Sequence, residues 1–318
     1  MKKKWSITLL TFFNMAIISI LVINYRNNFD QSRFINQLFL IPHSLMIIIV
    51  AINFCIIFFY GLRLMFLLET SYKASIAIAS VGYAANNILP FRLGEVFRLY
   101  FANKKYGITT TQTLVAMVFE RVVDLFSISC LSFIIILLSA WVLPITTHSL
   151  YLILIGPAIF LVFALIYPSQ VKQILCRLLP TSVIQRVIQS FYVEFMRIAS
   201  YQRLAGFSIY TLLIWVFTVM VFYIYFKGTL PLEKFTILDA ISLTVCTALS
   251  LAISSLPASV GLFEGGIVYF LHEIKHIEQS TALALAIILH LLIVIPQCLS
   301  MVYFLLIRNQ KVSTFAYD

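Results

Sequence analysis

Charged residues are scarce in this chain. Of its 318 residues only 11% are charged, and just 12 are acidic, whereas 62% are hydrophobic and the mean hydropathy is +1.01. The surface of a soluble domain of this length needs more charged residues than this chain has. The composition therefore predicts a membrane protein. The net charge of +10 would suggest nucleic acid for a soluble protein. In a membrane chain it indicates cytoplasmic loops and anionic headgroups, and we expect no nucleic-acid partner.

Motifs that mark enzymes and metalloproteins are also missing. The five cysteines are scattered, mostly within apolar runs, which indicates packing residues rather than metal ligands or disulfides. There is no glycine-rich nucleotide loop, no zinc-ligand spacing and no serine–histidine–aspartate set. The sequence therefore predicts no cofactor, no metal and no direct use of ATP. It argues against an enzyme, although catalytic groups hidden in membrane helices would leave no such motif.

Six hydrophobic stretches are long enough to cross a bilayer as helices. They are residues 5–24, 44–61, 123–143, 150–167, 207–226 and 282–307. Three lysines before the first stretch resemble the start of a signal peptide, but the stretch is long and no small-residue cleavage site follows it. We therefore expect an uncleaved first span.

Two further apolar segments, residues 74–89 and 239–256, are shorter, and each ends in a Leu-Pro pair. With a cytoplasmic N-terminus and six crossings, 16 of the 22 lysines and arginines fall on the cytoplasmic side and five outside. This orientation is favoured, and it places both termini in the cytoplasm and the chain in the cytoplasmic (inner) membrane. A full crossing by residues 74–89 would move four basic residues outside. We therefore expect both segments to form re-entrant hairpins, which enter from opposite faces.

The two hairpins carry the same pattern of residues. In each, a proline and a glycine stand four apart and a carboxylate follows. The residues are Pro90, Gly94 and Glu95 in the first hairpin, and Pro257, Gly261 and Glu264 in the second. Three crossings separate the hairpins, so the repeats are predicted to be inverted. Paired segments interrupted by glycine and proline indicate a transport site near the middle of the bilayer.

The predicted fold is therefore all-α: a polytopic membrane helix bundle with six full crossings and two re-entrant hairpins in an inverted repeat. A single integral membrane domain covers residues 1–318, with repeat 1 at about 44–143 and repeat 2 at about 206–307. Residues 168–205 form a cytoplasmic stretch with an amphipathic helix. This helix either lies on anionic lipid or packs beneath the bundle, and the sequence leaves both open.

Polar residues around the first hairpin turn form the first candidate site. Asn87 precedes the turn, and Arg92, Glu95 and Arg98 follow it. A helix that begins near Gly94 offers free N–H groups to an anion, and two arginines can hold a phosphate. The alternative is a set of ordinary loop charges in which Glu95 pairs with Arg98.

A second cluster lies within an apolar helix, where charges are costly unless paired and often mark function. Glu120 and Asp124 are four apart and share one face, and Arg121 can reach Asp124. The alternative is a self-neutralising structural cluster.

A third candidate site joins Glu264 and His290 in the second repeat. In the repeat alignment these residues correspond to Glu95 and Arg121. A glutamate and a histidine at membrane depth can bind a proton or position a headgroup. Alternatively, Glu264 caps the helix that begins beside it, and His290 is a hydrogen-bonded core residue.

Residues 87–98 and 120–125 resemble the flippase-like integral-membrane family of lysylphosphatidylglycerol synthases. The family pattern P-x-R-x-G-E-x-x-R followed by E-R-x-x-D is present from Pro90 and from Glu120. Residues 255–261 with Glu264 look like its second motif, although Leu262 and Phe263 replace a stretch that is usually small and glycine-rich. The resemblance implies that this chain corresponds to the membrane region that translocates aminoacylated phosphatidylglycerol in multiple-peptide-resistance proteins. It does not extend to the soluble aminoacyl-transferase domain, so we expect no lysyl transfer.

These observations predict a protein that translocates or presents an anionic lipid, either a phospholipid or a lipid-linked precursor. The predicted phosphate-binding residues are Asn87, Arg92, Arg98 and Arg121. The residues predicted to balance charge or bind a coupling proton are Glu95, Glu120, Asp124, Glu264 and His290. One alternative is an accessory subunit or intramembrane enzyme of lipid-linked sugar or glycolipid metabolism, with a glycosyltransferase or lipid-synthesis enzyme as partner. Another is a small-solute carrier, and a homodimer remains open.

Overall fold

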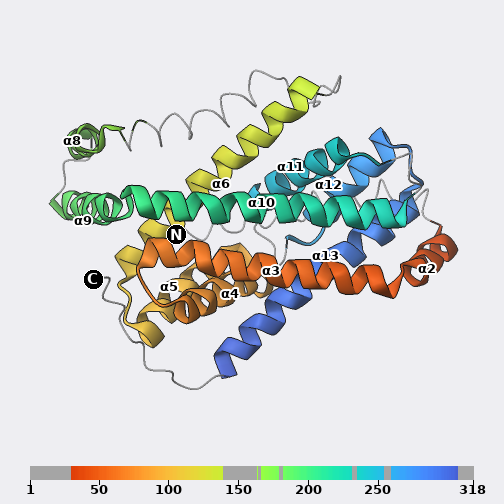
Figure 1. The fold of residues 1–318 in the computed structure, drawn as a ribbon, viewed down its shortest axis with the longest axis horizontal. Coiled ribbons are helices and arrows are strands. Elements are labelled where there is room, and N and C mark those ends of the chain that lie inside the picture. Colours follow the sequence, from red (N-terminus) through yellow and green to blue (C-terminus); the bar gives the residue numbers. More distant parts are fainter. Residues whose placement is uncertain are drawn as a thin grey trace, which may run out of the picture. The chain divides into compact units, whose positions relative to one another are not determined.

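The computed structural model describes residues 30–138, 163, 166–178, 182–230, 235–253 and 259–306, and this part of the chain is helical without strands (Figure 1). The all-α prediction is therefore confirmed. The chain forms two compact units. The first comprises Met1–Ile57, Ser80–Phe97 and Val216–Ile307, and the second comprises Phe58–Ala79, Arg98–Trp215 and Arg308–Asp318. Each unit contains residues from both predicted repeats. The two units therefore do not correspond to the two repeats.

Four helices are long and apolar enough to cross a membrane. They are α3 (His43–Leu68), α6 (Thr110–Leu138), α10 (Tyr201–Thr229) and α13 (Gln279–Leu306). They correspond to four of the six predicted crossings. The crossing at 5–24 lies outside the described residues, as does most of the crossing at 150–167, so the count of six remains a prediction. At 1.5 Å per residue, a helix of 26 residues spans about 39 Å, which exceeds a hydrocarbon core of about 30 Å.

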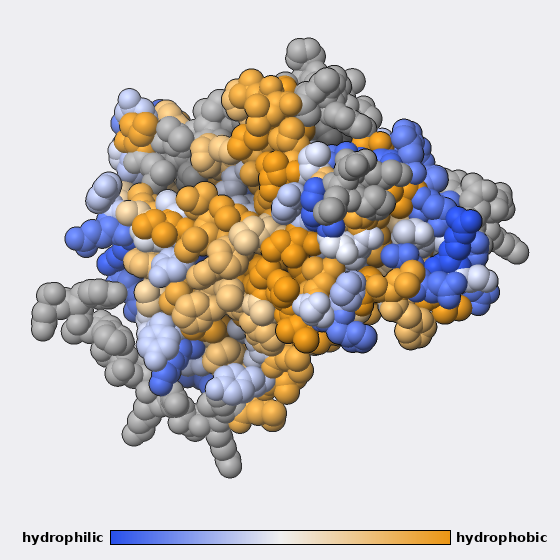
Figure 2. Space-filling view, turned by 45° about the vertical axis from the view of Figure 1, so that its right-hand side comes forward, coloured by the Kyte–Doolittle hydropathy of each residue, from blue (hydrophilic) through white to orange (hydrophobic). Residues whose placement is uncertain are grey.

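Large apolar side chains lie on the outside of these helices. Leu137 and Leu138 of α6 and Leu212 of α10 are among the most exposed, and the face drawn in Figure 2 carries extensive hydrophobic surface. In water such a surface would favour aggregation. Against lipid tails it incurs no penalty, because the tails are as apolar as leucine. The exposed residues therefore fit a multi-pass membrane protein.

The first predicted hairpin is a broken helix. α4 (Tyr72–Ile88) ends before Pro90, a 3₁₀ turn covers Pro90–Arg92, and α5 (Leu93–Tyr106) follows. Phe91 and Arg92 both have positive φ, at 55° and 54°. Non-glycine residues rarely adopt this conformation, which is strained and concentrates at functional sites. The break at Pro90 is thus confirmed, whereas a re-entrant path through a bilayer remains a prediction.

The second hairpin also contains two helices separated by a turn. α11 (Ile237–Ile253) is followed by α12 (Leu262–Tyr269) and a π-helical turn over Phe270–Ile274. Pro257 lies outside the described residues. Ser259 and Gly261 lead into α12 with positive φ, at 57° and 87°. Ser259 occupies the position equivalent to Arg92, so both turns place a non-glycine residue in the left-handed region.

The helices on either side of the two hairpins match closely in length. α4 and α11 each have 17 residues, and α6 and α13 have 29 and 28. Beyond each hairpin the chain reverses through an equivalent residue with positive φ, Gly107 at 68° and His276 at 55°. The next residues, Ile108 and Ile277, each donate a backbone hydrogen bond to the carbonyl six positions back. This is the helix-ending pattern in which a left-handed residue closes the last turn. The repeat therefore extends to local backbone geometry, while its inversion stays a prediction.

Each reversal also starts the following helix with a side-chain cap. The side chains of Thr109 and Gln112 each accept a backbone hydrogen bond from the other residue at the start of α6. Glu278 accepts from the backbone N–H groups of Ser280 and Thr281 at the start of α13. Burial alone would raise the pKa of Glu278, but the hydrogen bonds from Thr281 and Ser280 outweigh it and lower the pKa below its ordinary value.

Three further helices complete the described chain. They are α2 (Gln31–Leu40), α8 (Pro168–Leu178) and α9 (Ser182–Ile198). α9 packs on α6: the rings of Phe119 and Phe195 lie 6.4 Å apart, and Ile198 is fully buried. α8 packs on α9, with Lys172 over the ring of Tyr192. Of the two possibilities left open for this amphipathic stretch, the structure favours packing against the helices.

Candidate functional site

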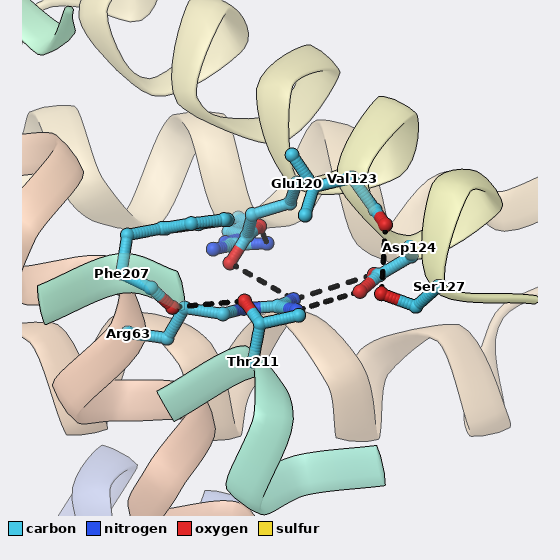
Figure 3. Close-up of polar contacts among 8 residues, drawn as sticks. Arg63, Glu120, Val123, Asp124, Ser127, Phe207 and Thr211 are labelled. Carbon is cyan, nitrogen blue, oxygen red and sulfur yellow. Dashed lines mark hydrogen bonds and ion pairs between the residues drawn. The ribbon is translucent and has the colours of Figure 1, made fainter. Parts of the chain in front are cut away.

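A cluster of four charged residues, of which three are buried and Asp124 is partly exposed, lies in the second unit. Arg63 of α3 places Nη1 2.6 Å from Asp124 Oδ1 and Nη2 3.4 Å from Glu120 Oε1. Arg98 of α5 places Nη1 2.8 Å from the other carboxylate oxygen of Glu120. Figure 3 shows Arg63 reaching from α3 toward Glu120 and Asp124 on α6. Three helices are therefore joined by one ionic network.

Local geometry explains how α6 presents both carboxylates. Glu120 and Asp124 are four residues apart, so they stand one turn apart on one face. The side chain of Arg63 is 0% exposed, and its guanidinium lies 5.3 Å and 5.5 Å from the ring centroids of Tyr60 and Phe207. Aromatic faces attract a desolvated cation. The arginine is thus held by charge on one side and by aromatic rings around it.

The cluster contains two positive and two negative side chains. Buried charges are tolerated when paired, and an uncompensated one is strongly destabilising. Asp124 binds Arg63 of α3, and Arg121 is exposed on α6. Arg98 binds Glu120. The structure thus contains a charge-neutral cluster, as in the alternative stated for the second candidate site, and Arg63 is one of its members.

Arg63 is the residue that sequence reasoning missed. The predicted span ended at residue 61, which left Arg63 in a loop. In the structure α3 continues to Leu68, so Arg63 lies within a helix long enough to cross the membrane. A charged residue inside such a helix indicates that it has a partner. A predicted span that extended past residue 63 would have identified Arg63 as such a residue.

The first unit contains the predicted pair of Glu264 and His290. Glu264 Oε1 lies 2.6 Å from His290 Nδ1, and its other oxygen accepts a 2.7 Å hydrogen bond from the backbone N–H of Gly261. The ring of Phe263 lies against that of His290, 4.5 Å between centroids. Both acid and imidazole are buried. The Glu264 carboxylate therefore caps α12 and also links it to α13. Capping by Glu264 and its contact with His290 occur at the same time.

The first hairpin turn contacts the second hairpin within the same unit. Arg92 donates from Nη2 to the carbonyl of Leu251 at 2.5 Å, in the last turn of α11. A cation is favoured there because the final carbonyls of a helix lack intrahelical partners. Asn87 donates to the side chain of Gln297 on α13 at 2.6 Å. The structure therefore brings Arg92 and Asn87 to the second repeat, while Glu95 is half-buried on α5.

The Glu264 contact gives a first testable prediction. In Glu264→Gln the neutral amide loses the charge-assisted bonds to His290 and to the N–H of Gly261. We expect a loss of about 1–3 kcal/mol in stability, the usual consequence of weakening a buried hydrogen-bonded charge. The midpoint of thermal unfolding in detergent measures it. Glu273→Gln is the matched control, because Glu273 is exposed just beyond α12. Equal midpoints for the two variants would contradict the capping role.

Long apolar helices, paired broken helices and buried ionic networks define a polytopic helical membrane protein. Among the described residues, no group of three or more histidines, cysteines, aspartates or glutamates is placed to hold a metal ion. A family model described as the lysylphosphatidylglycerol synthase TM region matches residues 9–300, and the chain belongs to this family. No curated protein and no solved structure matches the chain.

Proposed function

We propose that this chain translocates an anionic lipid across the membrane, with the headgroup passing along the turns of the two broken helices. Two observations support the proposal. The chain belongs to a family defined by the membrane region of lipid-modifying synthases. The observation that carries it is the contact between Arg92 in the first turn and the end of α11 in the second hairpin. Broken helices that meet in this way are a common design of transport sites.

Arg92 is the proposed phosphate ligand at this point. Its guanidinium is held by a neutral carbonyl, Leu251 O. A hydrogen bond between two charged groups is roughly twice as strong as a neutral one, and a guanidinium matches two phosphate oxygens at once. A lipid phosphate would therefore compete well with this carbonyl for Arg92. Asn87, three residues before the start of the turn, would add an amide donor.

The other predicted residues take different parts in this proposal. Arg98 is bound to Glu120 in the neutral cluster, so we assign it a supporting role rather than a direct contact with lipid. Arg121 is exposed on α6 and remains a candidate contact for a headgroup. Glu264 and His290 would balance the charge of the arginines or bind a coupling proton.

Transport by reconstituted protein tests the proposal. Vesicles containing the protein and a fluorescent anionic phospholipid report movement between leaflets when a membrane-impermeant reductant quenches the outer leaflet. We expect Arg92→Gln to slow movement roughly tenfold, the effect of losing one charge-assisted contact. Arg33→Gln is the matched control, since Arg33 pairs with Asp30 on an exposed helix end.

Two outcomes would refute the assignment. Equal rates for wild type and Arg92→Gln would remove Arg92 from the path. If vesicles with the wild-type protein show no lipid movement, translocation is refuted. That result would favour the competing function, which is presentation of a lipid-linked precursor to a partner enzyme.

A further inference from the structure

α5 carries a graded exposed face that the proposed transport path does not use. Leu93, Val96, Tyr100 and Lys104 are three or four residues apart, so they share one side of the helix, and all four are exposed. The face is apolar next to the hairpin turn and basic at the far end. From Leu93 to Lys104 the helix rises about 16 Å, roughly half the thickness of the hydrocarbon core. The gradient therefore fits a helix that runs from within the membrane to its surface.

The basic end of α5 combines lysines with aromatic rings. Lys105 Nζ lies 5.2 Å from the ring centroid of Phe101 and 5.8 Å from that of Tyr106. The two rings meet edge to face, 5.8 Å apart, and Phe101 is buried. The lysine is thus fixed over an anchored aromatic pair, while Lys104 next to it is exposed. Tyrosine and lysine together are typical of the headgroup level of a membrane.

The second repeat shows which part of this end is needed for the fold. Tyr269 occupies the position equivalent to Tyr100, and the two are 45% and 60% exposed. Glu273 and Ile274 stand where the first repeat has Lys104 and Lys105. Both helices nevertheless end through the same reversal, with equivalent positive-φ residues and equivalent backbone hydrogen bonds. The tyrosine is common to both repeats, whereas the lysine pair is specific to the first and is not required to end the helix.

We propose that Tyr100, Lys104, Lys105 and Tyr106 form a binding site for the headgroup phosphate of an anionic phospholipid in the cytoplasmic leaflet. The two ammonium groups supply the charge complementary to a phosphate. The phenols flank them at headgroup level, and the exposed apolar residues of α5 suit an acyl chain. The cytoplasmic side follows from the bias of basic residues. The site lies at the far end of α5 from the Arg92 turn, and lipid binding there does not depend on translocation.

Lipid retention measures this site directly. The protein is reconstituted in vesicles of mixed phosphatidylglycerol and phosphatidylcholine and extracted in mild detergent, and bound phospholipid is counted by native mass spectrometry. We expect the Lys104→Gln/Lys105→Gln variant to hold phosphatidylglycerol roughly tenfold more weakly, in line with the attraction of basic residues to anionic lipid, while phosphatidylcholine is unaffected. Lys172→Gln is the matched control, because Lys172 also lies over an aromatic ring, that of Tyr192, but on α8.

The outcomes separate this site from its alternatives. An equal loss in Lys172→Gln would show general surface attraction and overturn the proposal, as would unchanged retention in the double variant. Release of the lipid by millimolar inorganic phosphate would identify a free-phosphate site instead. Lipid retention by Arg92→Gln separates the two proposals. If Arg92→Gln retains lipid but transports it more slowly than wild type, both proposals are supported. If the protein retains lipid but neither wild type nor any variant transports it, only the lipid site on α5 is supported. Thermal unfolding midpoints equal to wild type confirm that each variant is folded.

Discussion

Replacing Arg63 with methionine is expected to destabilise the protein strongly. The substitution leaves Asp124 with no partner in the four-residue cluster, while Arg98 still binds Glu120. Removing one member of a buried ion pair costs about 3–5 kcal/mol, because the remaining charge stays desolvated. That is a large share of the stability of a typical domain. We expect little folded protein in detergent and a much lower midpoint of thermal unfolding.

A second substitution should restore most of this loss. Arg63→Met combined with Asp124→Leu removes one positive and one negative charge, and the pair of Arg98 and Glu120 remains. Apolar replacements of similar volume often match or exceed the stability of a buried ion pair. The double variant should therefore unfold within a few degrees of wild type. Arg33→Met serves as the exposed control and should change little, since exposed pairs contribute about 0–1 kcal/mol.

The rescue distinguishes structure from transport. A double variant that folds and still moves lipid would show that Arg63 and Asp124 act only in stabilising the helices. One that folds but moves no lipid would place this cluster in the transport cycle. Failure of Asp124→Leu to recover any stability would contradict the pairing of Arg63 with Asp124.

Features set by nearby residues could be predicted from the sequence. Long apolar runs located α3, α6, α10 and α13, because the length of a spanning helix is fixed by bilayer thickness. Pro90 located the break between α4 and α5, because proline cannot continue a helix at that point. The internal repeat placed Glu264 and His290 in one candidate site, and the two side chains are in contact in the structure.

Partners distant in sequence could not be predicted in the same way. Arg63 binds residues 57 and 61 positions away, and no spacing rule connects them. Helical spacing allows Arg121 to reach Asp124, but it gives no sign that Arg63 of α3 binds the same carboxylate. The predicted crossing at 123–143 covers only part of α6, which begins at Thr110. The charges of Glu120 and Asp124 are tolerated in this long apolar helix because they are paired.

The first hairpin turn should also be sensitive to a single methyl group added at Gly94. A Cβ added there would lie 2.2 Å from the backbone nitrogen of Asn86 and 2.6 Å from the carbonyl carbon of Ala85. Both atoms belong to the backbone of α4, so no side-chain rotation relieves the clash. Gly94→Ala must therefore push α4 and α5 apart at the turn. Overpacking of this kind costs about 1–3 kcal/mol, and we expect the upper end because the obstacle is main chain.

The functional consequence of Gly94→Ala follows from the neighbouring Arg92. Any shift of the turn moves this arginine relative to the carbonyl of Leu251, which it contacts at 2.5 Å. Lipid movement in reconstituted vesicles should therefore fall at least as far as in Arg92→Gln, together with a lower unfolding midpoint. Gly266→Ala is the matched control on α12, because its Cβ would meet the Ser250 hydroxyl at 3.1 Å and main chain no nearer than the Cys246 carbonyl oxygen, at 3.9 Å. A Gly94→Ala protein as stable and active as this control would show that close contact between α4 and α5 is not required at the turn, and Arg92 would then owe its position to the strained backbone at Phe91 and Arg92 alone.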